Sequence, residues 1–572
     1  MHKGRVSNRA GLALLAAALL LVPPAAADPP LTAAQVMARV FTTAQRAQAS
    51  GAGQALTEAG ARLAAGTGPL AARLRDRQDL TATVQALQDR LAGATSASGL
   101  QAEAAARDLQ TALDQALARL ADLDATIDRD FPEYRSLTDP APLTVPELQA
   151  LLDPDEALVM VLSDAVQSYV WAISPTAADW AAVPLGTEAL TQAVTHLRAQ
   201  ISPTDAALRG AAALEGSTPR QGPAFDRAAA HALYTDLFGP LDPILRGAGH
   251  LMIVADGPLT SLPFALLVTD PPEGADDDPA ALRATPWLIR RQAVTTLPTV
   301  AGLRTLRNPR AAPASEEPRL IGFGDPLLGY RAPAAPDADA PLLLAAADAA
   351  GAVVTRGVYD DLRRVADLAP LPNTARELRA LAAAVGQGRA TLYLGAEATE
   401  TQVKATDFTQ ANVLAFATHG LLSGGLPGLT EPALVFTPPD APDATDDALL
   451  TASEAAQLRL SADLIILSAC DTAGSDGQPG AEGLSGLARA FIYAGARAIL
   501  VSHWPVDDYA ASQLTVRMMR GMYGASRQSR ARALRALMLS LMELEGDRFA
   551  HPALWAPFVV VGEGGADRLR AP

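Results

Sequence analysis

Apolar positions recur in two different ways along this chain of 572 residues, and the pattern changes near residue 146. Beyond that point, short continuous apolar runs bounded by turn residues are typical of buried strands. Before it, apolar residues recur every three or four positions, as on one face of an α-helix; they are Leu80, Val84, Leu87 and Leu91, then Leu109, Leu113, Leu117, Leu120 and Ile127. The pattern predicts a helical region followed by an α/β domain.

The helical region, residues 28–145, is rich in Ala, Leu, Gln and Arg, with a break at 92–99. We expect an antiparallel helical hairpin that packs on itself or on the rest of the chain. A partner-binding array is the alternative, but the sequence has no clear 34-residue repeat, so tetratricopeptide units are not predicted. A proline-containing stretch ends the region and marks the best domain boundary; its prolines are Pro132, Pro140, Pro142 and Pro146.

Strands alternate with helices over the rest of the chain. Residues 157–164 and 168–174 are typical of a strand hairpin, and 250–267 of a strand, a tight turn and a helix entered at Pro263. Because helical stretches follow most of the later strands, much of the sheet should be parallel; those strands are expected at 319–326, 391–395, 413–420, 433–437, 464–470, 498–504 and 557–563. Segments without an apolar pattern are expected to be surface insertions, and they lie at 270–278, 311–317 and 332–341.

The first residues have the composition of a secretory signal. Lys3, Arg5 and Arg9 precede an apolar stretch at 10–22, and three alanines precede Asp28. We therefore expect residues 1–27 to be a cleaved signal peptide and the protein to be periplasmic or secreted, with no membrane span after cleavage. An uncleaved signal that anchors the chain in the inner membrane is the alternative, although the apolar stretch is shorter than the ~20 residues that span a bilayer.

Charge and composition narrow the classes of partner and cofactor. The net charge of −16 repels phosphates, so a nucleic-acid partner is not expected. A single cysteine and scattered histidines exclude a zinc–thiolate cluster, and neither a metal nor another cofactor is expected. Gly322 and Gly324 are too sparse for a dinucleotide site and are expected in a turn at a strand end.

Two of the expected strands end in residues that can carry nucleophilic chemistry. His419 and Gly420 end the run VLAFATHG, and Cys470, the only cysteine, ends the run LIILSAC. Because ligands bind at the carboxyl ends of parallel strands, a thiol and an imidazole can meet there as nucleophile and proton carrier. Taken singly, such a cysteine is more often a small buried hydrophobe, and such a histidine a satisfied polar residue. The two together favour a cysteine hydrolase.

Several segments resemble the CHAT domain, the caspase-HetF-associated-with-TPRs family of caspase-like and separase-like cysteine peptidases. The matching segments are ATHG at 417–420, LSACDTAGS at 467–475, the stretch 480–508, HPALWAPFVVVG at 551–562, and upstream 252–267, 287–307 and 371–381. The resemblance covers about residues 146–562. It implies two caspase-like halves, an inactive half at 146–315 and a catalytic half at 316–572, with a mostly parallel sheet and flanking helices.

The resemblance also implies an activity. In this family the residue matching Cys470 attacks a peptide carbonyl, and the residue matching His419 manages the proton of the leaving amine. The backbone N–H groups of Gly420 and Cys470 are expected as oxyanion donors. The expected function is that of an exported cysteine endopeptidase acting on a protein or peptide, with the N-terminal helices as the contact for a protein activator or partner. A non-catalytic scaffold module in an envelope or secretion assembly is the alternative.

Four residues are candidates for the substrate pocket. Asp507 and Asp508 lie in a segment similar to the separase segment whose acidic groups bind a basic residue, which favours cleavage after Arg or Lys. Alternatively, they cap a following helix. Asp471 is expected to line the pocket or order its loop, and Trp504 to be a pocket wall or a core side chain. His503 is a second candidate for titration near neutral pH, but strand alternation points it away from the site.

Overall fold

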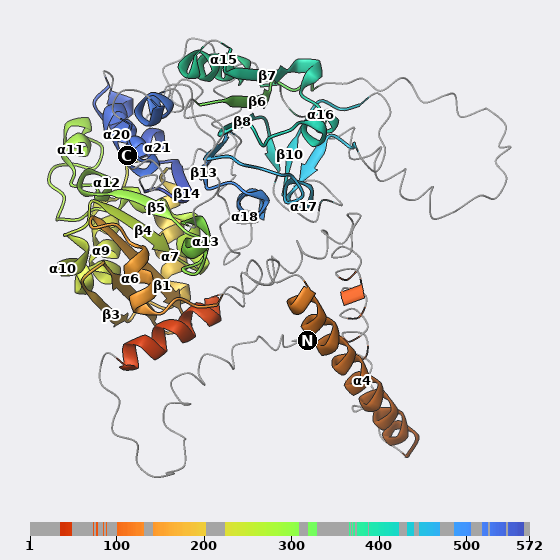
Figure 1. Cartoon of the computed structure of the whole chain (residues 1–572). Helices are drawn as coiled ribbons and strands as arrows, with labels where there is room; N and C mark the ends of the chain where they lie inside the picture. Colours follow the sequence, from red (N-terminus) through yellow and green to blue (C-terminus); the bar gives the residue numbers. More distant parts are fainter. Residues whose placement is uncertain are drawn as a thin grey trace, which may run out of the picture.

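A single large sheet forms the centre of the molecule (Figure 1). The computed structural model describes residues 35–48, 100–130, 141–201, 224–307, 318–328, 374–386, 388–421, 432–439, 446–468, 486–504, 517–523, 527–544 and 547–565, with isolated residues between them. Eleven strands of the described residues lie in the order β3, β2, β1, β4, β5, β14, β13, β12, β8, β6, β7. Their bounds in chain order are β1 Glu156–Ser163, β2 Ser168–Ile173, β3 Ala178–Val183, β4 His250–Val254, β5 Ala293–Thr296, β6 Leu320–Gly324, β7 Ala390–Leu394, β8 Val413–Ala417, β12 Leu464–Leu467, β13 Ala498–Ser502 and β14 Phe558–Gly562.

Parallel pairing dominates this sheet. Strands β1, β4 and β5 are parallel to one another, and so are β13, β12, β8, β6 and β7. Strand β14 lies between the two groups, antiparallel to β13 and paired with β5 at Val561 and Thr296. The predicted α/β fold, with a mostly parallel sheet and flanking helices, is confirmed.

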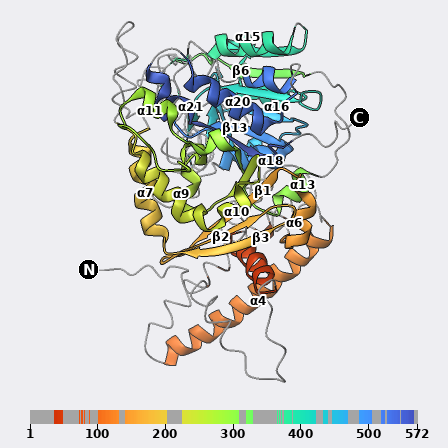
Figure 2. The same ribbon diagram turned by 90° about the vertical axis from the view of Figure 1, so that its left-hand side faces the viewer.

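Helices cover both faces of the sheet (Figures 1 and 2). Alternate residues of the central strands contact two different cores, as strand geometry requires: Leu414 and Phe416 face Phe491 in one core, whereas Ala415 and Ala417 face the other. The described helices and 3₁₀ turns of the α/β part are α6 Val145–Leu151, α7 Thr187–Ala199, α9 Arg227–Phe238, η1 Gly239–Leu241, α10 Asp242–Leu245, η2 Gly257–Ser261, η3 Phe264–Leu266, α11 Pro279–Ala284, α12 Leu288–Arg291, α13 Gly302–Leu306, α15 Thr374–Val385, η4 Gly395–Glu397, α16 Glu400–Ala405, α17 Ala452–Ala455, α18 Gly486–Ala494, α20 Arg530–Met542, η5 Asp547–Ala550 and α21 Pro552–Trp555.

The N-terminal helical segments pack in two ways. Helix α4, Leu100–Asp130, contains the predicted repeat that begins at Leu109, and it extends away from the sheet in Figure 2. Val84 is buried against Leu113 of α4, while the expected hairpin as a whole stays a prediction. A separate helix over 35–48 packs on the sheet instead, because its Phe41 is fully buried in the core that contains Trp171. The expected signal peptide at 1–27 and the stretch 131–140 lie outside the described residues.

Three local predictions were wrong. The helix expected after Pro263 is only the 3₁₀ turn η3, because Phe264 to Leu267 are all buried and offer no polar face. Residues 433–437 contribute β10, Ala433–Val435, to a separate three-stranded sheet rather than to the main sheet. Gly322 and Gly324 lie within β6 and not in a turn. The edge strand β3 was also missed, since its half-exposed residues form no apolar run.

The acidic segment 270–278 is anchored to the body. Arg227 is fully buried, and its Nε donates to Asp276 Oδ1 over 2.6 Å. The same guanidinium donates to the carbonyl oxygens of Glu273 and Gly274. Most residues of this segment are exposed, as expected for a surface insertion, and Arg227 anchors it to the body; 311–317 and 332–341 lie outside the described residues.

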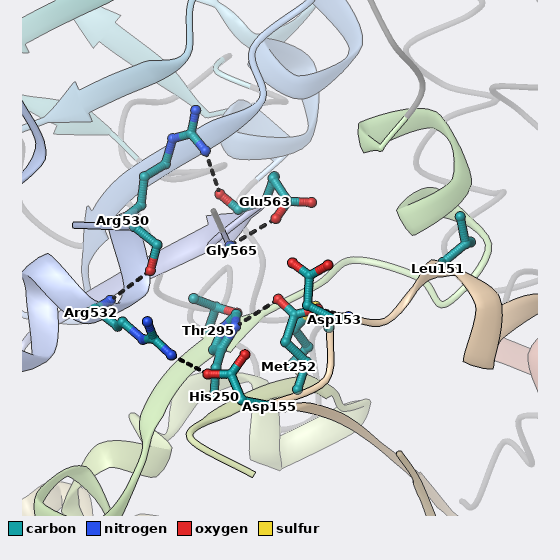
Figure 3. A network of polar contacts seen from close by, with 12 residues as sticks. Leu151, Asp153, Asp155, His250, Met252, Thr295, Arg530, Arg532, Glu563 and Gly565 are labelled. Carbon is teal, nitrogen blue, oxygen red and sulfur yellow. Dashed lines mark hydrogen bonds and ion pairs between the residues drawn. The ribbon is translucent and has the colours of Figure 1, made fainter. Parts of the chain in front are cut away.

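A cluster of buried charges joins β1 to the segment after β14, and Figure 3 shows His250, Thr295 and Glu563 of this region. The guanidinium of Arg307 lies 2.7 Å from Glu156 and 2.9 Å from Glu563. His250 bridges Glu156 and the hydroxyl of Thr295, at 3.2 and 2.8 Å. Burial raises the pKa of Glu156, but hydrogen bonds from His250 and Arg307 outweigh it and hold the pKa well below its usual value. Glu156, Arg307 and Glu563 thus form a buried group of paired charges.

No helix in the described ranges is both long and apolar enough to cross a membrane.

Candidate active site

His419 lies directly beyond the carboxyl end of β8, where the main sheet meets the small sheet. Its carbonyl accepts a hydrogen bond from the N–H of Val435 over 2.9 Å, and the buried hydroxyl of Thr418 donates to the carbonyl of Val435. The next residues form β9, Gly420–Leu421, which pairs with β10; strand β11, Leu449–Thr451, completes the small sheet. The backbone on both sides of the half-buried imidazole is therefore fixed by hydrogen bonds.

A group of carboxyl side chains attaches the small sheet to α16. Glu400 of α16 is 1% exposed and accepts a hydrogen bond from the backbone N–H of Asp447, at 2.8 Å. The ammonium group of Lys404 lies 2.5 Å from Glu400 and 2.7 Å from Glu454. Burial, reinforced by the negative charges of Glu454 and Asp447, raises the pKa of Glu400 to about 8 despite Lys404. Burial thus favours the protonated form of Glu400, while Lys404 favours its ionised form.

Glu400→Gln is expected to flatten the pH dependence of stability. Because the pKa of Glu400 rises from 4.5 to about 8 on folding, its stabilising contribution is full below about pH 4.5 and is lost as the pH passes 8. The glutamine stays neutral, so the variant should melt higher than the wild type at pH 9 and differ little from it at pH 5. Thermal unfolding measured across this range, with the exposed Glu397→Gln as control, checks the prediction; parallel curves for wild type and variant would contradict it.

Strand β12 places the segment that leads to Cys470 beside the strand of His419. Each β12 residue pairs with the β8 residue 51 positions earlier, from Leu464 with Val413 to Leu467 with Phe416. The ladder continues for one residue, because the N–H of Ser468 donates to the carbonyl of Phe416 over 2.9 Å. Cys470 and Asp471 lie outside the described residues.

Of the pocket candidates, the structure describes Trp504, while Asp507 and Asp508 lie outside the described residues. Trp504 is 1% exposed, and its indole N–H donates to the carbonyl of Ala553 over 2.9 Å. Trp504 thus packs in the core of the described residues, and a part in the substrate pocket stays a prediction.

His503 follows β13 and is buried at 3% exposure. Burial lowers the pKa of His503 to about 3, with a further contribution from the nearby Arg198, which argues against this candidate for titration near neutral pH. Arg198 of α7 donates hydrogen bonds to the carbonyls of His503 and Ser261. It thereby ties the segment after β4 to the segment after β13.

Two acidic residues at the same edge were missed by the sequence analysis. Glu377 of α15 is 5% exposed and accepts a hydrogen bond from the hydroxyl of Ser468 over 2.9 Å. Asp325 follows β6 with a positive φ of 54°, and its N–H donates to Thr374 Oγ1 over 3.0 Å. The sequence carried one signal for each residue. Glu377 is a carboxyl group on the apolar face of an amphipathic helix, and Asp325 directly follows a strand.

The described residues contain no group of three or more His, Cys, Asp or Glu side chains that could hold a metal ion.

Comparison with known proteins gives relatives that are much longer than this chain. Tetratricopeptide repeat protein 28 of Mus musculus is 36% identical over 115 residues, which are 20% of this chain and 4% of that protein. The Homo sapiens protein of the same name is 25% identical over 389 residues, covering 60% of this chain and 13% of that protein. The chain thus spans a small part of these relatives.

Solved structures resemble the chain only distantly. The Saccharomyces cerevisiae separase in its complex with securin gives a TM-score of 0.37 at 10% identity, covering 81% of this chain and 34% of that chain. The Arg-specific cysteine proteinase gingipain R gives 0.33 at 10% identity, covering 60% of this chain and 68% of that chain. In contrast, the family model of the CHAT domain matches residues 227–563, more than half of the chain. The chain therefore belongs to the CHAT domain family.

Proposed function

We propose that this protein is a cysteine endopeptidase in which Cys470 is the nucleophile and His419 the proton carrier. The observation that carries the proposal is the pairing of β12 with β8. Two peptide units separate Cys470 from Ser468, so their Cα atoms lie within about 7.6 Å of each other. The backbone N–H of Ser468 is hydrogen bonded to the carbonyl of Phe416, which lies three residues before His419. Cys470 also lies 51 positions after His419, the same offset that relates every paired residue of the two strands.

The chemistry follows from this pair. The thiolate attacks the carbonyl carbon of the peptide bond, a C–S bond forms, and the negative charge moves to the carbonyl oxygen. Backbone N–H groups of Gly420 and Cys470 stabilise that oxygen. The imidazolium of His419 gives its proton to the amine as the C–N bond breaks, and water then hydrolyses the thioester with His419 as base. A free thiol with a pKa of about 8.5 is a few per cent ionised at neutral pH, so an adjacent imidazole is sufficient to activate it.

A preference for Arg or Lys before the cut is part of the proposal. Asp325 lies at the carboxyl edge of β6, the strand that pairs with β8 through Gly324 and Ala417. Together with Asp507 and Asp508, it would supply carboxylates to a basic side chain near His419. The net charge of −16 attracts basic segments of a substrate to the protein as a whole.

The remaining features of the proposal are export and recruitment. Residues 1–27 are proposed to direct the chain to the periplasm or the medium, and the helical region 28–145 to bind a protein partner or activator. The projection of α4 away from the sheet supports the second point, because it leaves part of this helix away from the core. The domain limits at 145 and 315 stay predictions.

A peptide library tests the activity and the preference together. Residues 28–572 should cleave after Arg or Lys, and Cys470→Ala should remove all cleavage. Asp325→Asn and Asp507→Asn/Asp508→Asn should lower kcat/KM for these peptides by roughly 10- to 100-fold, because each removes the negative charge that strengthens a hydrogen bond from the basic side chain. Mass spectrometry of the products reports the residue before each cut.

The exposed Asp179→Asn serves as a charge-matched control on the edge strand β3. Cleavage without a basic preference would overturn the proposed pocket alone. No cleavage, even with added envelope extract, together with a stably bound protein, would overturn the enzyme and favour the scaffold module.

A further inference from the structure

Glu377 is a carboxyl group buried at the edge of the sheet where the proposed thiol lies. It occupies the first turn of α15 and is 5% exposed, on the same helix face as the buried Leu378 and Leu381. Burying a carboxyl group costs free energy unless it is hydrogen bonded, and Glu377 Oε2 accepts a hydrogen bond from Ser468 Oγ over 2.9 Å. Ser468 precedes Cys470 by two residues.

Close packing holds α15 on the strands beneath it (Figure 1). A Cβ atom at Gly324 would lie 2.7 Å from the side chain of Leu378 and 2.7 Å from the carbonyl oxygen of Ala417. At Gly322 it would lie 3.1 Å from Leu378. The two glycines therefore let the helix approach the backbone of β6 directly, which leaves Glu377 little freedom to shift.

Strand alternation relates Glu377 to the proposed catalytic pair. Ala417 of β8 and Ile466 of β12 belong to the same core as Leu378, on the face that α15 covers. Ser468 lies two positions after Ile466, and its hydroxyl points to this face, as its bond to Glu377 shows. His419 lies two positions after Ala417. Glu377 thus lies on the same face of the sheet as Ala417, Ile466 and the hydroxyl of Ser468.

We propose that Glu377 is a positioning residue for the nucleophile. Two hydrogen bonds hold Ser468: its N–H to the carbonyl of Phe416 and its hydroxyl to Glu377. The first fixes the register of β12 against β8, and the second fixes the strand end against α15. Together they set the position and direction from which the chain continues to Cys470. This inference rests on the proposed function.

Loss of the second hydrogen bond should reduce turnover without unfolding the protein. Ser468→Ala and Glu377→Ala are expected to lower kcat by about 10- to 100-fold with little change in KM, since a small displacement of a reacting group has effects of this size. Glu377→Gln keeps an acceptor oxygen for Ser468 and should retain most of kcat. The exposed Glu397→Gln serves as control.

The experiment measures kcat, KM, the melting temperature and the rate at which iodoacetamide alkylates Cys470, each for all variants. Support requires a fall in kcat for Ser468→Ala while the variant stays folded at the assay temperature, with rescue in Glu377→Gln relative to Glu377→Ala. Equal kcat in wild type and Ser468→Ala would overturn the inference and leave the peptidase intact. If the wild type cleaves nothing and its thiol reacts only as an ordinary thiol does, near pH 8.5, the proposed function fails and the inference fails with it.

Discussion

Replacing His419 by alanine is expected to slow peptide-bond cleavage by about 100- to 10,000-fold, the usual contribution of a positioned acid and base. The physical reason is the location of the imidazole at the end of β8, between two sheets whose hydrogen bonds fix its backbone. In the proposed mechanism, its loss leaves the thiol of Cys470 and the leaving amine without a proton partner. Cleavage of the best library peptide, measured as kcat/KM, checks the expected loss.

Alkylation of Cys470 separates a chemical role of His419 from a structural one. In His419→Ala the thiol should react only as the pH approaches its ordinary pKa of about 8.5, whereas the wild-type thiol should react at lower pH. His196→Ala is the matched control, because His196 lies half-exposed on α7, and it should leave both readouts unchanged. Identical alkylation profiles in wild type and His419→Ala would contradict the assignment of the pair.

Arg307→Met is expected to lower the free energy of unfolding by about 3–5 kcal/mol, as is usual when one partner of a buried ion pair is removed. The side chain of Arg307 is 3% exposed, and those of both its partners, Glu156 and Glu563, are 2% exposed. Methionine fills the space but leaves two carboxylates without their cation. Denaturant unfolding at pH 7 measures the loss, and Arg304→Met, whose ion pair with Glu147 is exposed, should cost less than about 1 kcal/mol.

The pH dependence of this loss has a definite sign. In the wild type, the lowered pKa of Glu156 contributes stability above the unfolded value of 4.5 and loses it as the pH falls through the folded value. In Arg307→Met, the carboxyl groups of Glu156 and Glu563 take up protons as the pH falls, which removes the free-energy cost of burying their charges. The difference between the proteins should therefore shrink from pH 7 toward pH 4. An equal difference at both values would show that Arg307 acts through packing alone.

Most of the main sheet was predictable, because its central strands are buried on both faces and appear in the sequence as continuous apolar runs. Strands β4, β8, β12 and β14 fall within predicted runs and are buried almost throughout. The edge strand β3 was not predictable in this way, since its exposed positions interrupt the pattern. Short apolar runs also do not specify which sheet they join, so β10 was assigned to the wrong sheet.

At the candidate site, the sequence placed His419 correctly at a strand end, because an apolar run followed by a polar residue and glycine marks that end. It did not find Glu377, whose partner Ser468 lies 91 positions away. It also could not give the hydrogen bond from the indole of Trp504 to Ala553, which lies 49 positions away. A side chain's partners are set by the fold and not by its neighbours in sequence.

The sequence by itself determined the α/β class, the main strands, the family and the identity of the candidate nucleophile and proton carrier, since these depend on local apolar patterns and short motifs. The tertiary structure alone decided which charged groups are buried together. Arg307 and Glu563 are 256 positions apart, and the burial of either is tolerable only because the fold brings them within hydrogen-bonding distance. No local pattern encodes such a pairing, because its free energy depends on contacts that exist only when the whole sheet is assembled.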